Sequence, residues 1–557
     1  MAALLGSCTS GGSEGPPPAD PAADRFIRAW NDRDGPSMAA LVGRLASKWT
    51  AARFERLLAR ASRNGAVESF VVERTSAVDE APTSGRRSTA RVPYAVTYAS
   101  AAAGHPVRLE GSFRLGYDGE RREWRVLWSK KMLWPGIPDA DRFQVRYRWP
   151  QRAPIVDRRG RRLARGSGGD RAYPFGAVGG SVVGHVASPR SRRRAPAAAV
   201  VGASGLERAY EDRLAGEPLR VLVVVSRKGR VLETLGRRRG RRGRPVQATI
   251  DALVQRSAER ALGDTIGAVV VLEPSSGDLL AAVSSGSFDP NNYVGGSELS
   301  PFNRALSGLY PPGSSLKVLT ASAALDSRAV TPSTRLTGPA EYKGVRNFES
   351  GSFGRIDFAG ALRNSVNTAF AQVAEKLGGA RLSRYARAFG FGRPPAMALE
   401  AATSSFPPPR DNWDLMWSSI GQAQVLATPL EMASIAATIA NRGKRLEPRA
   451  TTLDPVHGTR VVARRTAREM ASLMSAVVVS GTGTRASIPG VQVAGKTGTA
   501  EVDVNGVRRN HAWFICFAPV AEPLVAVAVV VEYGGVGGEV AAPLAGRVLE
   551  AVLPLVQ

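Results

Sequence analysis

The sequence predicts a multidomain α+β protein, and three observations lead to that expectation. The chain has 557 residues, and hydrophobic cores stop growing at roughly 250–300 residues, beyond which chains divide into domains. Hydrophobic residues make up 43% and charged residues 22%, as in ordinary globular proteins. Helical and strand-like periodicities alternate along the chain, with turn residues between them. We therefore expect several domains that combine helices with antiparallel strands.

Residues 21–137 predict an N-terminal α+β roll. Apolar residues recur at helical spacing in 23–30 and 52–61. Two or three helices against a curved antiparallel sheet fit this order of elements, and a spacer or docking role is the simplest expectation. Four alternating runs, separated by turn residues, follow the helices: 67–78, 90–101, 107–117 and 124–128.

Residues 138–245 form the next segment and are rich in arginine, glycine and short apolar pieces. Residues 153–164 fit two strands joined by a tight turn at Arg159 and Gly160. Residues 205–216 have the pattern of a short helix that ends at a glycine. The intervening stretch 191–199 is basic and of low complexity, which indicates a loop.

From residue 246 onward the composition is that of a compact enzyme domain. We expect a helix at 252–262, a buried strand at 267–272, a turn at 274–277 and a returning strand at 279–284. No internal repeat is visible in the sequence. The expected organisation is then a tether followed by three domains, with the bounds 1–20, 21–137, 138–245 and 246–557.

The chain is strongly basic, with 75 Lys and Arg against 48 Asp and Glu and a formal net charge of +27. Such a charge would suit nucleic acid, anionic lipid or an acidic wall polymer. The arginine-rich runs lack the interleaved aromatic side chains of a nucleic-acid stacking platform. We therefore expect no nucleic-acid partner and a basic face that tolerates an anionic surface.

Cysteine and histidine are scarce. The two cysteines, Cys8 and Cys516, and four scattered histidines can build neither a zinc cluster nor a disulfide framework. We therefore expect no metal and no cofactor.

The first residues are similar to the end of a lipoprotein signal. Leu5, Gly6 and Ser7 precede Cys8, the residue that would carry the lipid. The charged region and most of the apolar region of a signal peptide are missing from this sequence, so an ordinary free cysteine stays open as the alternative. No stretch reaches the roughly 18–20 apolar residues that span a bilayer. A Gly-, Ser- and Pro-rich tether follows Cys8 and would hold the folded body away from a membrane.

Ser314 and Lys317 are the first candidate catalytic residues. Two prolines and Gly313 precede an apolar helical pattern, so we expect Ser314 at a helix N-terminus and Lys317 one turn later on the same face. A serine hydroxyl is a poor nucleophile until a base removes its proton, and a lysine can be that base only when neutral. A desolvated pocket and a second nearby cation would lower the lysine pKa. Alone, this spacing is weak evidence, because two common residue types recur at it by chance, and a capping serine followed by a solvated lysine is then the favoured interpretation.

The second candidate motif is Ser365-Val-Asn367, which also precedes a helical pattern. Its hydroxyl can relay a proton and its carboxamide can bond a substrate amide. Helix capping is the alternative interpretation.

The third candidate motif, Lys496-Thr-Gly-Thr499, follows an apolar start. Lys496 supplies positive charge, and the hydroxyls of Thr497 and Thr499 suit a carboxylate. Gly498 would leave room for a ligand backbone along the strand edge. The alternative is an exposed strand with a charged end.

In this order, the three motifs resemble the active-site set of the penicillin-binding proteins and serine β-lactamases. The turn near Gly160 and the helix at 205–216 resemble the dimerisation (pedestal) domain of that family, which implies that residues 138–245 form an extended, β-rich linker domain. Residues 21–137 resemble the nuclear-transport-factor-like domain of low-affinity penicillin-binding lipoproteins. The chain as a whole resembles a class B (monofunctional) penicillin-binding protein. Further stretches similar to the transpeptidase family are 303–305, 419–422, 426–430, 511–514 and 517–519.

The resemblance implies a C-terminal domain of the penicillin-binding and serine β-lactamase fold, with a central antiparallel sheet. It also implies a peptidoglycan D,D-transpeptidase that acts on stem peptides ending in D-Ala-D-Ala. Ser314 would attack the penultimate D-alanine carbonyl, Lys317 would take the serine proton, and Ser365 would pass a proton to the leaving nitrogen. An amine of a neighbouring stem peptide would resolve the acyl-enzyme, and a β-lactam would acylate the same serine.

The same resemblance implies roles for the remaining site residues. Asn367 would orient the donor peptide, Lys496 would set the local field, and Thr499 would hold the terminal carboxylate. The backbone amides of Ser314 and Thr499 would form the oxyanion hole.

Partners and location follow from the resemblance as well. The N-terminal residues lack the acidic motifs of a glycosyltransferase, so a separate glycan polymerase is expected. The protein would work at the outer face of the bacterial cell membrane, and its front domain suggests tolerance to β-lactams.

Three alternatives stay open: a D,D-carboxypeptidase that uses water as acceptor, a serine β-lactamase, and a non-catalytic β-lactam-binding scaffold. The β-lactamase is disfavoured because no Glu-x-x-Leu-Asn loop is visible.

Overall fold

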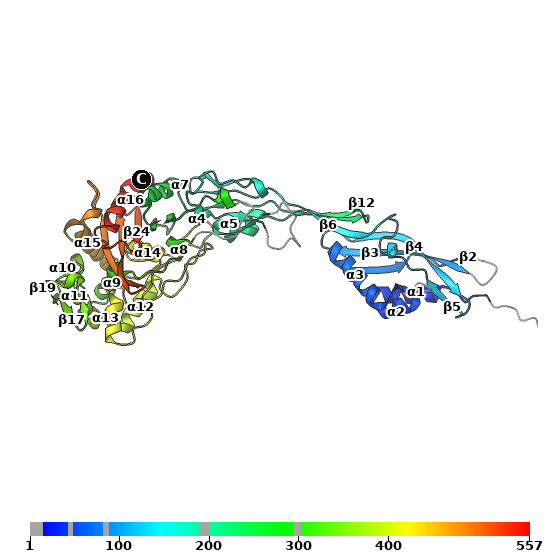
Figure 1. Cartoon of the computed structure of the whole chain (residues 1–557), viewed down its shortest axis with the longest axis horizontal. Coiled ribbons are helices and arrows are strands. Elements are labelled where there is room, and N and C mark those ends of the chain that lie inside the picture. The colour runs from blue at the N-terminus through cyan, green and yellow to red at the C-terminus, as the bar shows by residue number, and fades with distance from the viewer. Residues whose placement is uncertain (1–14, 43–47, 82–87, 189–199, 294–301) are drawn as a thin grey trace, which may run out of the picture. The chain divides into compact units, whose positions relative to one another are not determined.

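The computed structural model describes residues 15–42, 48–81, 88–188, 200–293 and 302–557. Cys8 and the basic stretch 191–199 lie outside these residues. The contacts divide the chain into two compact units, and each takes two segments of the sequence (Figure 1). The first unit comprises Met1–Pro150 and Glu217–Arg241, and the second comprises Gln151–Gly216 and Arg242–Gln557.

In the first unit, three helices and an antiparallel sheet enclose an aromatic core. The sheet has the order β1-β3-β4-β5, and β2 pairs with β3. Trp128 lies in this core, with ring centroids 5.1 Å from Phe54 and 5.5 Å from Trp30. The helices and strands predicted for 21–137 are confirmed, and α2 and β2 are additional. The elements are α1 (Asp20–Asn31), α2 (Gly35–Leu41), α3 (Ala51–Gly65), β1 (Val67–Arg74), β2 (Asp79–Ala81), β3 (Thr89–Ser100), β4 (Val107–Asp118) and β5 (Glu123–Val126).

A second, three-stranded sheet completes the first unit. Its order is β12-β11-β6, with β6 (Arg142–Arg148), β11 (Leu219–Val225) and β12 (Val231–Arg238). Leu222 and Val224 of β11 are fully buried and belong to the same apolar cluster as the helices of this unit. The hairpin 219–238, which lies some 70 residues further along the chain than β6, is therefore part of this unit's core.

The second unit begins with short elements around buried ion pairs. The predicted turn is confirmed, since Gly160 has a φ of +82° between β7 (Ile155–Val156) and β8 (Arg162–Ala164). The predicted helix at 205–216 forms as two short helices, α5 (Gly205–Ala209) and α6 (Glu211–Ala215). Glu207 is fully buried and pairs with Arg152 and Arg171 at 2.7 Å, so the buried charges are compensated.

A five-stranded antiparallel sheet forms the centre of the second unit, in the order β15-β14-β24-β23-β22. Helices α7 and α16 cover one face and α14 lies on the other (Figure 1). In β14, Val269 and Val271 face one apolar cluster while Ala268 and Val270 face another, so both faces of the strand are buried. The sheet and its covering helices are β14 (Gly267–Leu272), β15 (Leu279–Ser284), β22 (Ala494–Val504), β23 (Val507–Ala518), β24 (Val525–Val531), α7 (Ala252–Leu262), α14 (Pro429–Ala440) and α16 (Ala541–Val556).

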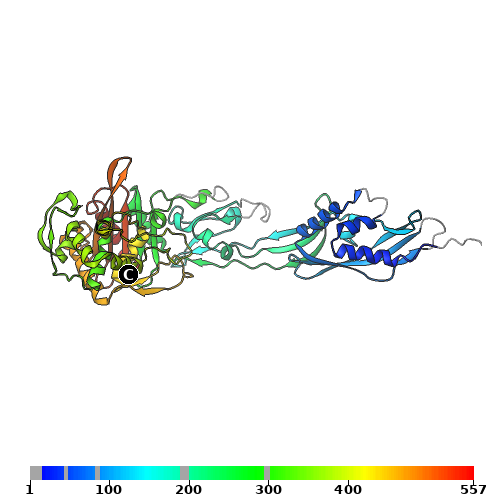
Figure 2. The ribbon, with the colours of Figure 1, turned by 90° about the horizontal axis from the view of Figure 1, so that it is seen from below.

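Further helices pack against the apolar cluster on the α14 side. The 3-10 turn η5 (Gly313–Leu316) leads directly into α9 (Lys317–Asp326), and every residue of α9 from Lys317 to Leu325 is buried. The hairpin β22–β23, drawn in orange, projects from the body of this unit (Figure 2). No helix in the described part of the chain has the length and apolar character needed to cross a bilayer. The other helices include α10 (Phe358–Arg363), α11 (Asn367–Leu377), α12 (Gly379–Phe389), α13 (Asn412–Ser419) and α15 (Arg464–Ser480).

Candidate active site

Ser314 lies in η5, one turn before α9, on the wall of a cavity of about 860 Å³. The turn is fixed by contacts from distant segments. The Gly313 amide donates to the Gly421 carbonyl at 2.9 Å, and the Trp513 indole donates to the Pro311 carbonyl at 3.0 Å. Gly313 has a φ of +53°, which a glycine adopts without strain. The predicted place of Ser314 at a helix N-terminus is confirmed.

Lys317 is fully buried, and its amine meets the second motif. Its Nζ lies 2.6 Å from Asn367 Oδ1 and 2.8 Å from the Ser365 carbonyl oxygen. Burial, and then the charge of Lys496, hold the pKa of Lys317 well below its usual range. A neutral amine has two N–H bonds, and these two acceptors use both. Its lone pair is then left to accept a proton.

The Ser365 hydroxyl lies between two amines. Lys496 Nζ is 2.9 Å from Ser365 Oγ, and Lys317 Nζ is 3.4 Å from it. Ser365 has a φ of +57°, a left-handed conformation that is uncommon for a serine and costs free energy. This strained residue stands between α10 and α11, where the second helix presents Asn367. The Asn367 amide donates to the Arg346 carbonyl at 2.9 Å, which fixes its orientation.

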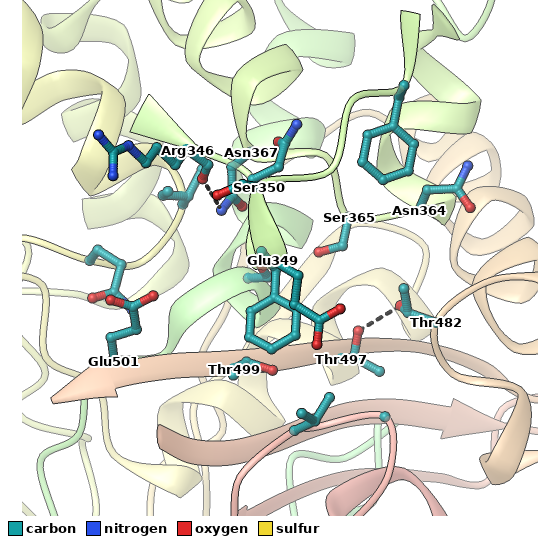
Figure 3. A pocket seen from close by; sticks show the side chains of 18 of the residues that line it. Arg346, Glu349, Ser350, Asn364, Ser365, Asn367, Thr482, Thr497, Thr499 and Glu501 are labelled. Atoms are coloured by element: carbon teal, nitrogen blue, oxygen red, sulfur yellow. Dashed lines mark hydrogen bonds between the residues drawn. The ribbon is translucent and has the colours of Figure 1, made fainter. Parts of the chain in front are cut away.

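The third motif lies on the edge strand β22. Lys496 is fully buried, and burial lowers its pKa to about 7. Thr497 and Thr499 line the cavity (Figure 3). The Thr497 and Thr482 hydroxyls are 2.7 Å apart, and the Gly537 amide donates to Thr499 Oγ1 at 3.2 Å.

Gly498 lets the third motif approach the first. A Cβ at this position would lie 2.8 Å from the Pro312 carbonyl oxygen and 3.0 Å from the Ser315 nitrogen. The missing side chain therefore allows close packing of β22 against η5 within the protein. Contact of Gly498 with a ligand backbone stays a prediction.

The structure thus brings together all three motifs, although 182 residues separate Ser314 from Lys496 in the sequence. Their hydroxyls and amides converge on one cavity with Ser365 and Thr497 on opposite walls (Figure 3). Two supporting residues escaped the sequence analysis. Arg346 acts through its backbone carbonyl, which no side-chain pattern reveals, and Thr482 stands in a Gly-Thr-Gly-Thr stretch whose similarity to the third motif could have drawn attention to it.

The model of the penicillin binding protein transpeptidase domain matches residues 267–550, which is half of the chain and includes every motif described above. The chain belongs to this family. The penicillin-binding protein dimerisation domain matches residues 166–248 of this transpeptidase, and the NTF2-like N-terminal transpeptidase domain matches residues 18–141. The expected three-domain fold class and the resemblance to class B penicillin-binding proteins are confirmed.

Relatives of this chain are named as peptidoglycan D,D-transpeptidases. The peptidoglycan D,D-transpeptidase PbpA of Mycolicibacterium smegmatis is 37% identical over 400 residues, which cover 63% of this chain and 79% of the relative. The peptidoglycan D,D-transpeptidase MrdA of Haemophilus influenzae is 32% identical over 411 residues and covers 63% of each chain.

Solved structures agree with these relatives. The crystal structure of PBPA from Mycobacterium tuberculosis has 34% identity and a TM-score of 0.60, and the match covers 72% of this chain and 98% of that chain. The penicillin G acyl-enzyme complex of the same protein has 33% identity and a TM-score of 0.59 and covers 72% and 100%. The present protein is a peptidoglycan D,D-transpeptidase, as the sequence predicted.

Proposed function

We propose that this transpeptidase cross-links stem peptides ending in D-Ala-D-Ala through an acyl-enzyme on Ser314. The observation that carries the proposal is the position of the Ser365 hydroxyl, 2.9 Å from Lys496 Nζ and 3.4 Å from Lys317 Nζ, at the cavity that Ser314 lines. Two buried amines and two hydroxyls at one cavity can pass a proton away from a nucleophile and return it to a leaving group.

Acylation uses the first two motifs. The lone pair of Lys317 accepts the Ser314 hydroxyl proton while Oγ bonds to the carbonyl carbon of the penultimate D-alanine. The C–N bond to the terminal D-alanine then breaks, and Ser365 passes a proton to the leaving nitrogen. Backbone amides of Ser314 and Thr499 stabilise the oxyanion between the two steps.

The third motif binds the end of the donor peptide. Lys496 contributes positive charge, and Thr497 and Thr499 present hydroxyls to the terminal carboxylate. Gly498 keeps this strand close to the nucleophile, and Asn367 orients the donor backbone. An amine of a second stem peptide then attacks the ester carbon, and the bond from this carbon to Ser314 Oγ breaks. The amine proton returns to Oγ through the same groups, and the new amide is the cross-link.

The partners follow from this reaction. Cross-linking of peptidoglycan takes place outside the cytoplasm, and β-lactams are inhibitors of the proposed site because they acylate Ser314. Attachment to the membrane through a lipid on Cys8 and dependence on a separate glycan polymerase belong to the proposal. So do the domain bounds 21–137, 138–245 and 246–557.

The test is intact-protein mass spectrometry after exposure to penicillin, with the parent chain and the Ser314→Ala variant side by side. The parent is expected to gain the mass of one penicillin, and the variant none. A second assay supplies two stem peptides, one bearing a free amine, and detects the cross-linked dimer. An adduct that persists in Ser314→Ala would contradict the assigned nucleophile.

A further inference from the structure

Helix α13 carries two indoles, one turn apart, at the active-site cavity. Trp417 lines the cavity, whereas Trp413 is 52% exposed. Their ring centroids are 5.8 Å apart, and their planes meet at 46°. We call these two side chains the aromatic track, because they form an apolar surface that begins at the cavity wall and continues to the protein surface.

The outer end of the aromatic track has polar neighbours. Asn412 precedes Trp413, and its amide donates to Glu375 at 2.5 Å. Lys343 Nζ donates to the same carboxylate at 2.7 Å. Gly344 lines the cavity, and a Cβ built on it would lie 3.4 Å from the Trp413 indole nitrogen. An exposed indole with hydrogen-bonding groups beside it is suited to a ligand that has both an apolar face and polar substituents.

We propose that the aromatic track binds the glycan strand to which the stem peptide is attached. This inference rests on the proposed function, because the peptide in the cavity must then be covalently linked to a sugar outside it. A pyranose ring has a face of C–H groups that packs on an indole, and hydroxyl groups at its rim that Lys343, Asn412 and Glu375 can bond.

The size of the surface favours a sugar over a protein partner. A stable protein interface takes roughly 800 Å² from each partner, whereas the exposed part of the aromatic track is a single indole. Contacts with the unreacting part of a substrate also contribute to catalysis, because their binding free energy can offset the cost of orienting the reacting groups. Small β-lactams carry no sugar and would not use this surface.

The test measures the binding of the full chain to glycan strands from which the peptides have been removed. Trp413→Ala is expected to bind about five- to tenfold more weakly than the parent, which is the loss of one aromatic stacking contact. Trp413→Phe keeps a ring and should retain most of the affinity. Trp149→Ala is the matched control, since Trp149 is 39% exposed in the first unit.

The acylation rate with penicillin, measured on every variant, checks folding and the active site independently of the sugar. Equal affinity of the parent and Trp413→Ala for glycan strands would overturn the inference, and so would an equal loss in Trp149→Ala. If penicillin does not acylate Trp413→Ala, the Trp413→Phe variant decides. When Trp413→Phe is acylated at the normal rate, the inference requires that it bind glycan strands more tightly than Trp413→Ala. A parent chain that penicillin does not acylate would instead contradict the proposed function, without affecting the binding measurement.

Discussion

At the scale of single residues, the site depends on two lysines that are both removed from water. Burial lowers the pKa of each, and the charge of Lys496 lowers that of Lys317 further. Each amine has two short-range acceptors: Asn367 Oδ1 and the Ser365 carbonyl for Lys317, and Ser365 Oγ and the Thr497 carbonyl for Lys496. What distinguishes the two lysines is the neighbouring positive charge, which lowers the pKa of Lys317 in addition to burial. The same residue type can therefore serve as a neutral base at one position and as the positive charge of the site at the other.

These pKa shifts predict a bell-shaped dependence of acylation on pH. Acylation needs a neutral Lys317, whose pKa burial and the charge of Lys496 hold well below its usual range, and a charged Lys496, which loses its proton as the pH rises through about 7. The rate constant for penicillin acylation should therefore fall on the alkaline side near pH 7 and on the acidic side below the pKa of Lys317.

Lys496→Arg tests the alkaline limb of this profile. A guanidinium stays charged throughout this range, so the alkaline limb should move to higher pH while the acidic limb stays. An alkaline limb that keeps its position in Lys496→Arg would show that Lys496 is not the group that titrates there. The profile is measured by stopped-flow with a fluorescent penicillin on both proteins.

At the scale of elements, the site depends on the contact between the edge strand β22 and the nucleophile turn η5. Gly498 and Gly313 lie on the two sides of this contact, and a Cβ on Gly313 would lie 2.8 Å from the Thr499 carbonyl oxygen. Backbone atoms therefore set the distance between Ser314 and the third motif. Any added side chain must push the strand and the turn apart.

Gly498→Ala is expected to slow acylation by penicillin about a hundredfold, because a displacement of about 1 Å in an active site has effects of that size. The loss of stability should be modest, about 1–3 kcal/mol from overpacking. Gly169→Ala is the matched control, since a Cβ there meets nothing within 4 Å. Acylation at the parental rate in Gly498→Ala would show that the strand can adjust and that this contact does not position Ser314.

At the scale of the whole molecule, the chain forms two units from four segments. It leaves the second unit after Gly216, contributes Glu217–Arg241 to the first unit, and returns at Arg242. Glu217 and Arg241 are joined by two backbone hydrogen bonds of 2.9 and 3.0 Å, so the two ends of this inserted segment, residues 217–241, lie side by side. The inserted segment places Leu222 and Val224 in the core of the first unit.

Removing the inserted segment 217–241 should affect the two units differently. Residues 1–150 alone lack β11 and should unfold with a lower Tm and less cooperativity than residues 1–150 joined to 217–241 by a short linker.

Conversely, residues 151–557 with 218–240 replaced by a short Gly-Ser turn should be acylated by penicillin within about twofold of the parent rate, because they retain the whole second unit. Differential scanning calorimetry and the acylation assay check the two expectations. A cooperative, equally stable fragment 1–150 would show that β11 is dispensable there.

The sequence by itself determined the local features of this protein. Periodicity placed α1, α3, α7 and the central strands β14 and β15, and the turn residues before Ser314 placed it at a helix N-terminus, because the repeat of a helix or strand is written in neighbouring residues. The spacing of the three motifs was enough to indicate the family. The roles of the site residues, and lipidation of Cys8, stay predictions.

Only the tertiary structure decided which distant residues meet. The pairing of Thr482 with Thr497, the support of Asn367 by the Arg346 carbonyl, and the position of Trp413 beside the cavity all join segments at least 15 residues apart in sequence. The membership of β11 in the first unit is of the same kind. Such contacts depend on how whole elements pack, and a backbone carbonyl or a missing Cβ leaves no mark in the local pattern of side chains.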